Sequence, residues 1–283
     1  MDRIAIIVLG LLAGSFLNVC IYRLPRGISL VRPRSRCPCC GHAVGAWENI
    51  PILGYLLLRG RCRGCAAAIS IRYPLIEALT AGAFLLAYLR YGAAPEFLRF
   101  AFFLVAMLAL ICTDYDWHQL PDEITLGGLV VGCVFAFWVP GAAISAGNAV
   151  AGALLGAGIL WLIGEGYFRL RGRPGMGLGD VKMMACVGAF LGWQRTLTTL
   201  VLAALAGTLV GLTLAGLVFA RRVLRARSRG RSWPAAAGAA RASIGAFFTR
   251  RALPFGVFLG GMAAASWLWG QPLWTWYLRL AQH

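Results

Sequence analysis

The sequence has 283 residues, of which 60% are hydrophobic and 13% charged, and its mean hydropathy is +0.74. These values exclude an ordinary soluble globular domain and indicate a protein that lies in a lipid bilayer. The formal net charge of +17 could suggest a nucleic-acid-binding protein, but the basic residues cluster beside apolar segments, as they do in the cytoplasmic loops of membrane proteins.

Eight apolar segments predict an all-α polytopic membrane protein with about eight transmembrane helices. A helix needs about 20 apolar residues to cross the hydrocarbon core of a bilayer, and seven of the segments are close to that length. The sixth is too short to span unaided, so we expect it to tilt, to be shielded by its neighbours or to form a re-entrant segment. The segments are residues 4–22, 74–91, 97–113, 124–140, 146–168, 183–193, 196–219 and 253–270.

The first segment is expected to be a retained anchor, formed by residues 1–22, rather than a cleaved signal. It lacks a small-x-small cleavage site after its core, and it continues into Arg23 and Arg26 as a stop-transfer flank does. The rest of the chain is expected to comprise a small soluble domain over residues 23–73 and a helical membrane domain over residues 74–283.

Clusters of arginine predict the orientation of the chain. Nine of the 26 arginines lie in residues 23–72 and nine in residues 221–251, and a third basic group comprises Arg169, Arg171, Arg173 and Lys182. By the positive-inside rule the three stretches are cytoplasmic, and threading eight crossings through them places both termini outside and the loop 114–123 in the cytoplasm. Residues 221–251 combine arginine with alanine, glycine and serine, so we expect a basic, partly disordered loop close to anionic lipid headgroups.

The soluble domain over residues 23–73 contains two C-x-x-C pairs separated by 21 residues. Brought together by a hairpin, they supply the four thiolates of a structural Zn²⁺ site, which would close a zinc-ribbon-like domain too small to fold on its core. Reduced thiols without metal are the alternative, since the cytoplasm disfavours disulfides. Cys39 is expected to be a bystander. The pairs are Cys37 with Cys40 and Cys62 with Cys65.

The ten acidic residues are few enough for their positions to be informative. Asp114, Asp116, Asp122 and Glu123 lie at the predicted cytoplasmic ends of the third and fourth segments, and Asp180 ends a glycine-rich run before the sixth. The expected topology places both groups on one side of the membrane at similar depth, so they can meet. Two carboxylates a few ångströms apart share one proton while the ionised partner activates water, which is the chemistry of aspartic proteases.

Several of these acids also have a structural interpretation. Asp180 could be the N-cap of the helix that follows it. For Asp122, which follows Pro121, the N-cap is the favoured interpretation. Asp116 either orients Asp114 or faces water.

Other functional classes fit the sequence less well. There is no G-x-S-x-G or H-E-x-x-H motif for a serine or zinc peptidase. A proton-coupled transporter would need acids near mid-bilayer, whereas Glu77 and Glu165 lie near cytoplasmic ends, where they can reach interfacial water or pair with arginine. A membrane-anchored nucleic-acid-binding module would not need two acidic groups at one depth. We therefore expect the lipid bilayer, and no nucleic acid, as a partner.

Short motifs follow one another in a specific order along the chain. They are Gly14-Ser15-Phe16-Leu17-Asn18-Val19, Tyr22-Arg23-Leu24-Pro25, the two C-x-x-C pairs, Glu48-Asn49-Ile50-Pro51, Ser70-Ile71-Arg72-Tyr73-Pro74, Asp114-Tyr115-Asp116, Leu120-Pro121-Asp122 and Gly177-Leu178-Gly179-Asp180. Each alone is weak evidence. In this order, they make nearly the whole chain resemble the type IV prepilin peptidase family, the A24-type aspartyl proteases.

The resemblance implies that Asp114 and Asp180 are the catalytic pair. It also implies a multi-pass protein of the bacterial inner membrane that cleaves the leaders of type IV prepilins or pseudopilins at the cytoplasmic face, just before their hydrophobic helix. Family members with the Cys-rich domain often also methylate the new N-terminal residue with S-adenosylmethionine. No glycine-rich nucleotide fingerprint shows where that cofactor binds. The basic loop 221–251 departs from the family, and no role is assigned to it.

Overall fold

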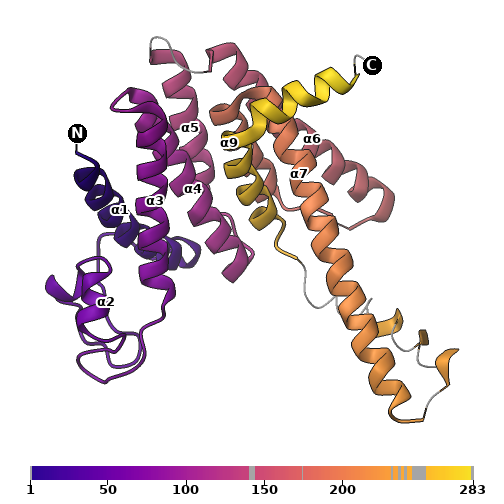
Figure 1. Ribbon diagram of the computed structural model, residues 1–283, viewed down its shortest axis with the longest axis horizontal. Helices are drawn as coiled ribbons and strands as arrows, with labels where there is room; N and C mark the ends of the chain where they lie inside the picture. Colours follow the sequence, from indigo (N-terminus) through magenta and orange to yellow (C-terminus); the bar gives the residue numbers. More distant parts are fainter. Residues whose placement is uncertain are drawn as a thin grey trace.

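The computed structural model describes residues 2–139, 144–173, 175–230 and 253–281, together with the short pieces 232–234, 237–238 and 241–243. This part of the chain is helical, and its two isolated β-bridges lie between residues 36 and 68, so the all-α prediction is confirmed for it. The elements (Figure 1) are α1 (Arg3–Arg23), η1 (Leu24–Arg26), η2 (Trp47–Asn49), α2 (Leu53–Leu57), α3 (Arg72–Tyr91), α4 (Pro95–Trp117), α5 (Asp122–Trp138), α6 (Ala146–Arg171), α7 (Leu178–Arg227) and α9 (Phe255–Ala281).

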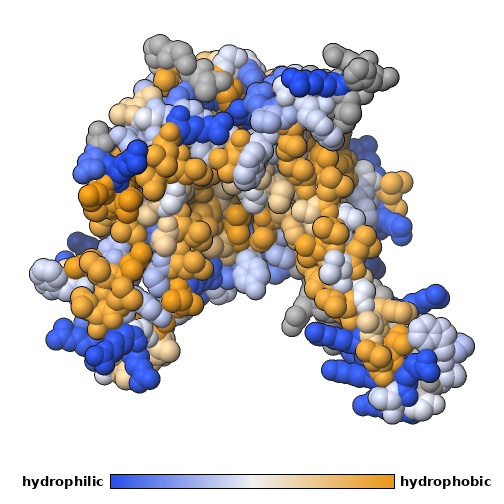
Figure 2. Space-filling view, in the orientation of Figure 1, coloured by the Kyte–Doolittle hydropathy of each residue, from blue (hydrophilic) through white to orange (hydrophobic). Residues whose placement is uncertain are grey.

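The surface of the molecule is that of a membrane protein. Among the described helices, four are long and apolar enough to cross a membrane: α1 with the turn that follows it, α4, α6 and α7. On the face shown in Figure 2, apolar side chains form a band across the middle, and hydrophilic ones gather along the upper edge, over the Cys-rich region and at the far end of α7. Figure 1 shows that α1 begins and α9 ends at one end of the molecule, opposite the Cys-rich region and the last turns of α7.

Helix α1 packs closely against α3 along a pair of glycines. A Cβ at Gly10 would lie 2.6 Å from the Cα of Ala81, and one at Gly14 would lie 2.7 Å from the Cα of Glu77. Small residues four positions apart let the backbones of two membrane helices come into contact. This packing holds the two ends of the Cys-rich region together, because that region leaves from α1 and returns through α3.

Helix α7 is broken at Gly192, whose φ of 74° lies in the left-handed region. The N–H of Trp193, just after the break, donates to Asn148 Oδ1 at 3.0 Å. The part before the break packs against α5, α6 and α9, and most of residues 183–191 are buried. The short sixth segment predicted at residues 183–193 is therefore shielded by its neighbours, which is one of the three expected arrangements.

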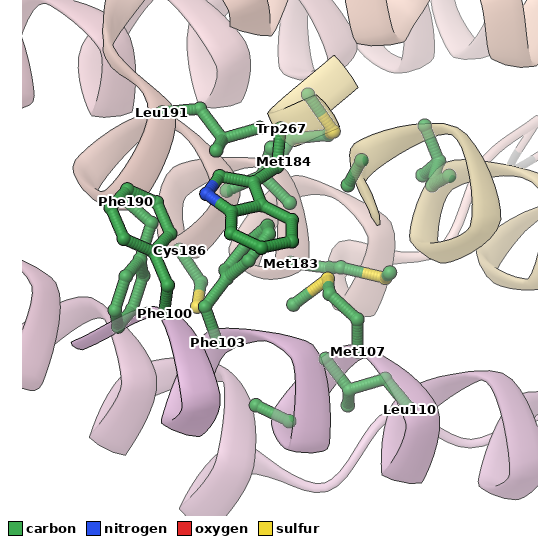
Figure 3. Packing of buried hydrophobic residues seen from close by; sticks show 14 of the residues in the cluster. Phe100, Phe103, Met107, Leu110, Met183, Met184, Cys186, Phe190, Leu191 and Trp267 are labelled. Atoms are coloured by element: carbon green, nitrogen blue, oxygen red, sulfur yellow. The ribbon is translucent and has the colours of Figure 1, made fainter. Parts of the chain in front are cut away.

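Aromatic and methionine side chains fill the core between α4, α7 and α9 (Figure 3). Phe100 of α4 stacks on Trp267 of α9 with ring centroids 5.4 Å apart, and Phe103 packs 5.2 Å from Phe190 of α7. Met183 of α7 is fully buried in the same cluster. This core fixes α4 and α7, which carry the acidic residues Asp114 and Asp180 described below, against α9.

A buried arginine caps the first part of α7. Arg99 of α4 is fully buried, and its Nη2 donates to the carbonyl oxygens of Ala189 at 3.1 Å and Phe190 at 3.2 Å. These carbonyls lie just before the break, where the helix no longer supplies N–H donors. Glu96 lies 3.9 Å from the guanidinium and partly balances its charge. Arg99 thus compensates locally for the interruption of α7.

Replacing Arg99 by methionine is expected to lower the melting temperature of the purified protein by several degrees. Two buried carbonyls lose their hydrogen-bond donor, and each unsatisfied carbonyl lowers the free energy of unfolding by about 1–3 kcal/mol. In a chain of this size, a loss of about 1 kcal/mol lowers the melting temperature by about 2–4 °C. Arg99→Lys should give an intermediate melting temperature, because an ammonium group lacks the fixed, planar set of N–H donors of a guanidinium group. Thermal unfolding followed by tryptophan fluorescence measures the effect, with Arg90→Met at an exposed position of α3 as the control. Unchanged melting of Arg99→Met would contradict the capping role.

Two helix boundaries differ from the sequence prediction. Helix α4 continues to Trp117, so Asp114 lies inside a helix rather than in the predicted loop 114–123. Helix α7 continues to Arg227, so the predicted basic loop 221–251 begins with helical residues, because arginine is a good helix former. The predicted partial disorder of this loop falls in large part on residues outside the described chain.

Candidate active site

Asp114 and Asp180 meet at one cavity. Asp114 lies in the last turns of α4, and Asp180 lies in the first turn of α7. Both line a cavity of about 350 Å³, and they lie close enough for the charge of Asp114 to act on Asp180. The structure thus brings together the two acidic groups that the sequence placed at one depth, while the catalytic role of the two residues stays a prediction.

The direction of α7 explains why the two carboxyl groups meet. Asp180 lies beside Asp114 at the C-terminal end of α4. Ten residues further on, the Phe190 carbonyl contacts Arg99 near the N-terminal end of α4. The first part of α7 therefore runs antiparallel to α4, and its start is held at the level of the last turns of α4.

The glycine-rich run before α7 gives Asp180 its position. Gly177, and not Asp180, is the N-cap of α7, and the N–H of Asp180 donates to the Gly177 carbonyl at 3.2 Å. A Cβ at Gly179 would lie 3.1 Å from the Cβ of Leu120, so glycine lets the start of α7 approach the loop between α4 and α5 closely. The N-cap interpretation of Asp180 is therefore wrong, and its carboxyl group is free to line the cavity.

Two other acids of this region, Asp116 and Asp122, form ion pairs with residues of other helices. Asp122 is the first residue of α5 rather than its N-cap, so that interpretation was wrong, and it accepts from Lys182 Nζ at 2.8 Å. This pair ties the start of α5 to the first turns of α7 at the edge of the cavity. Asp116 pairs with Arg72 at the start of α3, an arrangement that neither of its sequence interpretations anticipated.

The two acids within apolar segments also have local partners. Glu165 accepts from Arg169 Nε at 2.8 Å, as its predicted pairing with arginine implies. Glu77 Oε2 accepts from the backbone N–H of Ile52 at 2.7 Å, and Ile52 itself has a φ of 60°, in the left-handed region. The second contact anchors the Cys-rich region on α3. The sequence gave no signal for it, since a backbone donor carries no residue-type signature.

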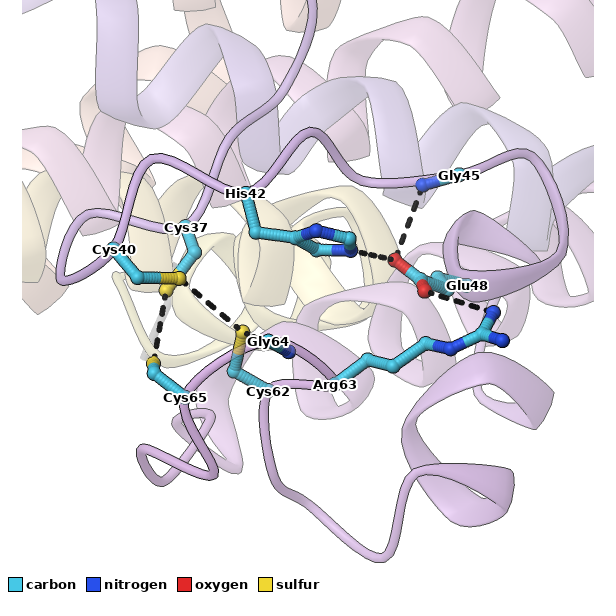
Figure 4. Close-up of polar contacts among 9 residues, drawn as sticks. All are labelled: Cys37, Cys40, His42, Gly45, Glu48, Cys62, Arg63, Gly64 and Cys65. Carbon is cyan, nitrogen blue, oxygen red and sulfur yellow. Dashed lines mark hydrogen bonds and ion pairs between the residues drawn. The ribbon is translucent and has the colours of Figure 1, made fainter.

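Four cysteines of the Cys-rich region converge on one point (Figure 4). Their sulfur atoms all lie within 4.8 Å of one another, with Cys37 Sγ 3.8 Å from Cys65 Sγ and Cys40 Sγ 4.0 Å from Cys62 Sγ. Zn–S bonds of about 2.3 Å in a tetrahedron place the sulfurs about 3.8 Å apart, whereas a disulfide requires about 2.05 Å. The four thiols therefore fit a tetrahedral metal ion, and Cys39 lies outside the cluster.

The local backbone closes the two cysteine turns and prepares the thiol of Cys37 in particular for a metal. In each C-x-x-C turn, the N–H of the first cysteine donates at 2.8 Å to the carbonyl five residues later, and an isolated β-bridge closes the turn. The N–H groups of Cys40 and Cys39 lower the pKa of Cys37 to about 6. A lowered pKa favours the thiolate form that a metal requires.

Glu48 joins the two cysteine turns (Figure 4). Its carboxylate accepts from the N–H of Gly45 at 3.1 Å and lies 3.3 Å from His42 Nε2 of the first turn and 3.6 Å from Arg63 Nη1 of the second. The pKa of Glu48 lies below its usual value. The hydrogen bond from the Gly45 N–H lowers it most, and the charges of His42 and Arg63 lower it further. The sequence contained Glu48 within a motif but did not predict this bridging role.

Comparisons with known proteins agree with these features. The family model for the bacterial peptidase A24 N-terminal domain matches residues 8–91, which include the four cysteines. The model for the type IV leader peptidase family matches residues 101–212, which include Asp114 and Asp180. No solved structure matches the chain.

Similar proteins from several bacteria carry the name prepilin leader peptidase/N-methyltransferase. The one from Pseudomonas putida is 38% identical, with 95% of this chain and 91% of the relative covered. The one from Aeromonas hydrophila is 37% identical over the same shares, and the one from Neisseria gonorrhoeae is 41% identical over 65% of this chain and 72% of the relative. The chain belongs to the type IV leader peptidase family.

Proposed function

We propose that this chain removes the leader peptide of type IV prepilins or related pseudopilins, with Asp114 and Asp180 as its catalytic pair. The observation that carries the proposal is the cavity that these two residues, from helical segments far apart in the sequence, line together. The name shared by the relatives supports the substrate class. Peptide hydrolysis is the chemistry that such a pair performs.

The proposed reaction uses one proton shared by the two carboxyl groups. The ionised carboxylate takes a proton from water, whose oxygen bonds to the scissile carbonyl carbon. The protonated carboxyl group donates its hydrogen to the carbonyl oxygen, which stabilises the tetrahedral intermediate. The carbon–nitrogen bond then breaks, and the nitrogen leaves with the proton that came from water. As the carbonyl re-forms, one hydroxyl of the intermediate returns its proton to the carboxylate that had donated it, which restores the shared proton of the pair.

The proposed topology has about eight membrane crossings in the bacterial inner membrane, with residues 1–22 as the first helix, 23–73 as a cytoplasmic Cys-rich domain and 74–283 as the peptidase domain. The common end of α1 and α9 (Figure 1) supports an even number of crossings. The arginine-rich ends support placing the acidic cavity near the cytoplasmic face. The bilayer, and no nucleic acid, is the proposed partner besides the substrate.

Two cofactors belong to the proposal. The thiolates of Cys37, Cys40, Cys62 and Cys65 would hold a structural Zn²⁺, which supplies cross-links to a domain with little core of its own. S-adenosylmethionine would supply the methyl group for the new N-terminal residue, on the support of the relatives' name. The Cys-rich domain carries no glycine-rich nucleotide fingerprint, so no residues are assigned to this methyl donor.

The test is the mass of the product formed from a full-length prepilin by the purified protein in detergent or lipid. We expect loss of the leader and, when S-adenosylmethionine is added, one further increase that corresponds to a methyl group. The control is the double variant Asp114→Asn/Asp180→Asn, which should leave the prepilin uncut. An uncut substrate with the wild-type protein in a folded state would overturn the proposal, and a cut product without added methyl would overturn only the methylation.

A further inference from the structure

The N-terminus of α9 lies against Asp114. The backbone N–H of Val257 donates to Asp114 Oδ2 at 3.2 Å, and the N–H of Gly256 is directed at the same carboxyl group. The first N–H groups of a helix have no acceptor within the helix and carry the positive end of its dipole. Helix α9 therefore supplies two donors that favour a negative charge on Asp114.

Residue 256 has to be glycine for this contact to form. A Cβ at this position would lie 2.8 Å from Oδ2 and 3.0 Å from Cγ of Asp114, and 3.3 Å from Leu120 Cδ2. Real Cβ atoms essentially never come within 3.0 Å of another heavy atom, so any larger residue would push apart the carboxyl group and the start of α9. The absence of a side chain thus places two backbone donors within reach of Asp114.

The start of α9 is fixed by the packing of the rest of the helix. Leu259, Ala263 and Trp267 are fully buried, and Trp267 lies among the side chains of α4 and α7 (Figure 3). A Cβ at Gly260 would lie 2.7 Å from Ile111 Cγ1 of α4. Because α9 is held this closely against α4, its donors keep a fixed position relative to Asp114.

Asp180 lacks a comparable set of donors. It lies in the first turn of α7, but its carboxyl group accepts no hydrogen bond from the described residues, and it faces the charge of Asp114. The other charged or titratable groups around the pair are His118 at the end of α4, Glu123 of α5 and the pair of Lys182 with Asp122. These groups line the same cavity. The two carboxyl groups of the pair are therefore chemically unequal.

We propose that the N-terminus of α9 makes Asp114 the ionised member of the pair, which takes the proton from water. Asp180 is then the protonated member, which donates to the scissile carbonyl oxygen. Gly256 and Val257 act as positioning residues for Asp114 and do not touch the substrate. This assignment rests on the proposed function and adds to it which carboxyl group serves as base and which as acid.

The test is the pH dependence of kcat/KM for leader cleavage by Val257→Pro in the full-length protein. Proline is tolerated in the first turn of a helix, where it removes the N–H group and replaces the valine side chain by a ring of similar size. The acid limb of the profile reports the group that must be ionised, so loss of a donor to that group should move the limb to higher pH, by about one pH unit. Gly256→Ala should move it in the same direction, with a larger loss of rate.

Another glycine of the same helix serves as the control. Gly261→Ala adds a methyl group toward open space and should leave both the rate and the acid limb as in the wild type. If Val257→Pro and Gly256→Ala reduce the rate equally at every pH with the limb unmoved, the contact is only structural and the assignment is overturned.

Asp114→Asn, assayed in parallel, separates this assignment from the proposed function. If Asp114→Asn still cleaves, the catalytic pair is wrong and the assignment falls with it. If Asp114→Asn is inactive while the acid limb of Val257→Pro stays in place, the pair stands and only the roles given to its two members are overturned.

Discussion

Replacing Asp114 or Asp180 by asparagine is expected to lower the rate of leader cleavage by about 10³-fold or more. Asparagine keeps the shape of the side chain, but it can neither take a proton from water nor deliver one, and positioned acid–base groups contribute about 10²–10⁴-fold each. The double variant should be no slower than the slower single variant, because the two groups act as a unit. Single-turnover cleavage of a prepilin peptide, with protein amount in the membrane fraction matched, measures the effect.

The matched controls are Asp116→Asn and Asp122→Asn, which make the same chemical change at the same end of the helices. Both residues form partly exposed ion pairs, with Arg72 and Lys182 respectively. Exposed pairs contribute little to stability, so these variants should retain activity within about tenfold. Near wild-type cleavage by Asp180→Asn, or inactivity of all four variants alike, would contradict the assignment of the pair.

Cys62→Ser is expected to abolish metal binding and unfold the Cys-rich region. The region has few buried apolar residues, so a metal would supply most of its stability, and structural zinc contributes about 10 kcal/mol or more in comparable small domains. Elemental analysis should find one Zn²⁺ per wild-type chain and none in the variant. Limited proteolysis should then cut the variant between α1 and α3, while the membrane helices resist.

Cys39→Ser provides the matched control for this experiment. Cys39 belongs to the same turn as Cys37 and Cys40 but lies outside the cluster of four sulfurs. Its replacement should leave both the metal content and the proteolysis pattern unchanged. A Cys62→Ser protein that keeps its metal, or that resists proteolysis as the wild type does, would show that the four thiolates are not the ligands.

The features that the sequence predicts well are those that depend on residue type and on spacing along the chain. Length and hydropathy alone predict the helices, since a bilayer imposes both. The two C-x-x-C pairs predict the cluster of sulfurs, because few other arrangements use four thiols at that spacing. Asp114 and Asp180 could be placed at one depth because arginine is distributed unevenly along the chain.

The features missed are those in which a backbone group acts as the partner. The N–H of Val257 at Asp114, the N–H of Ile52 at Glu77 and the carbonyl of Phe190 at Arg99 join segments far apart in the sequence. Every residue carries these backbone groups, so no sequence pattern indicates which of them will be used. The exceptions are glycines such as Gly256, whose importance becomes visible only once the neighbouring atoms are known.

The short first part of α7 has a consequence for how the protein enters the membrane during synthesis. Its residues before Gly192 span about 21 Å at about 1.5 Å per residue, which is less than the hydrocarbon thickness of about 30 Å. Such a segment is too short to span the bilayer unaided, so we expect it to insert together with the longer second part of α7, as a helical hairpin, against helices that are already in place. Asp180 is carried at the start of this hairpin. Its approach to Asp114 is therefore a late event, and a chain halted before that point has no complete catalytic pair.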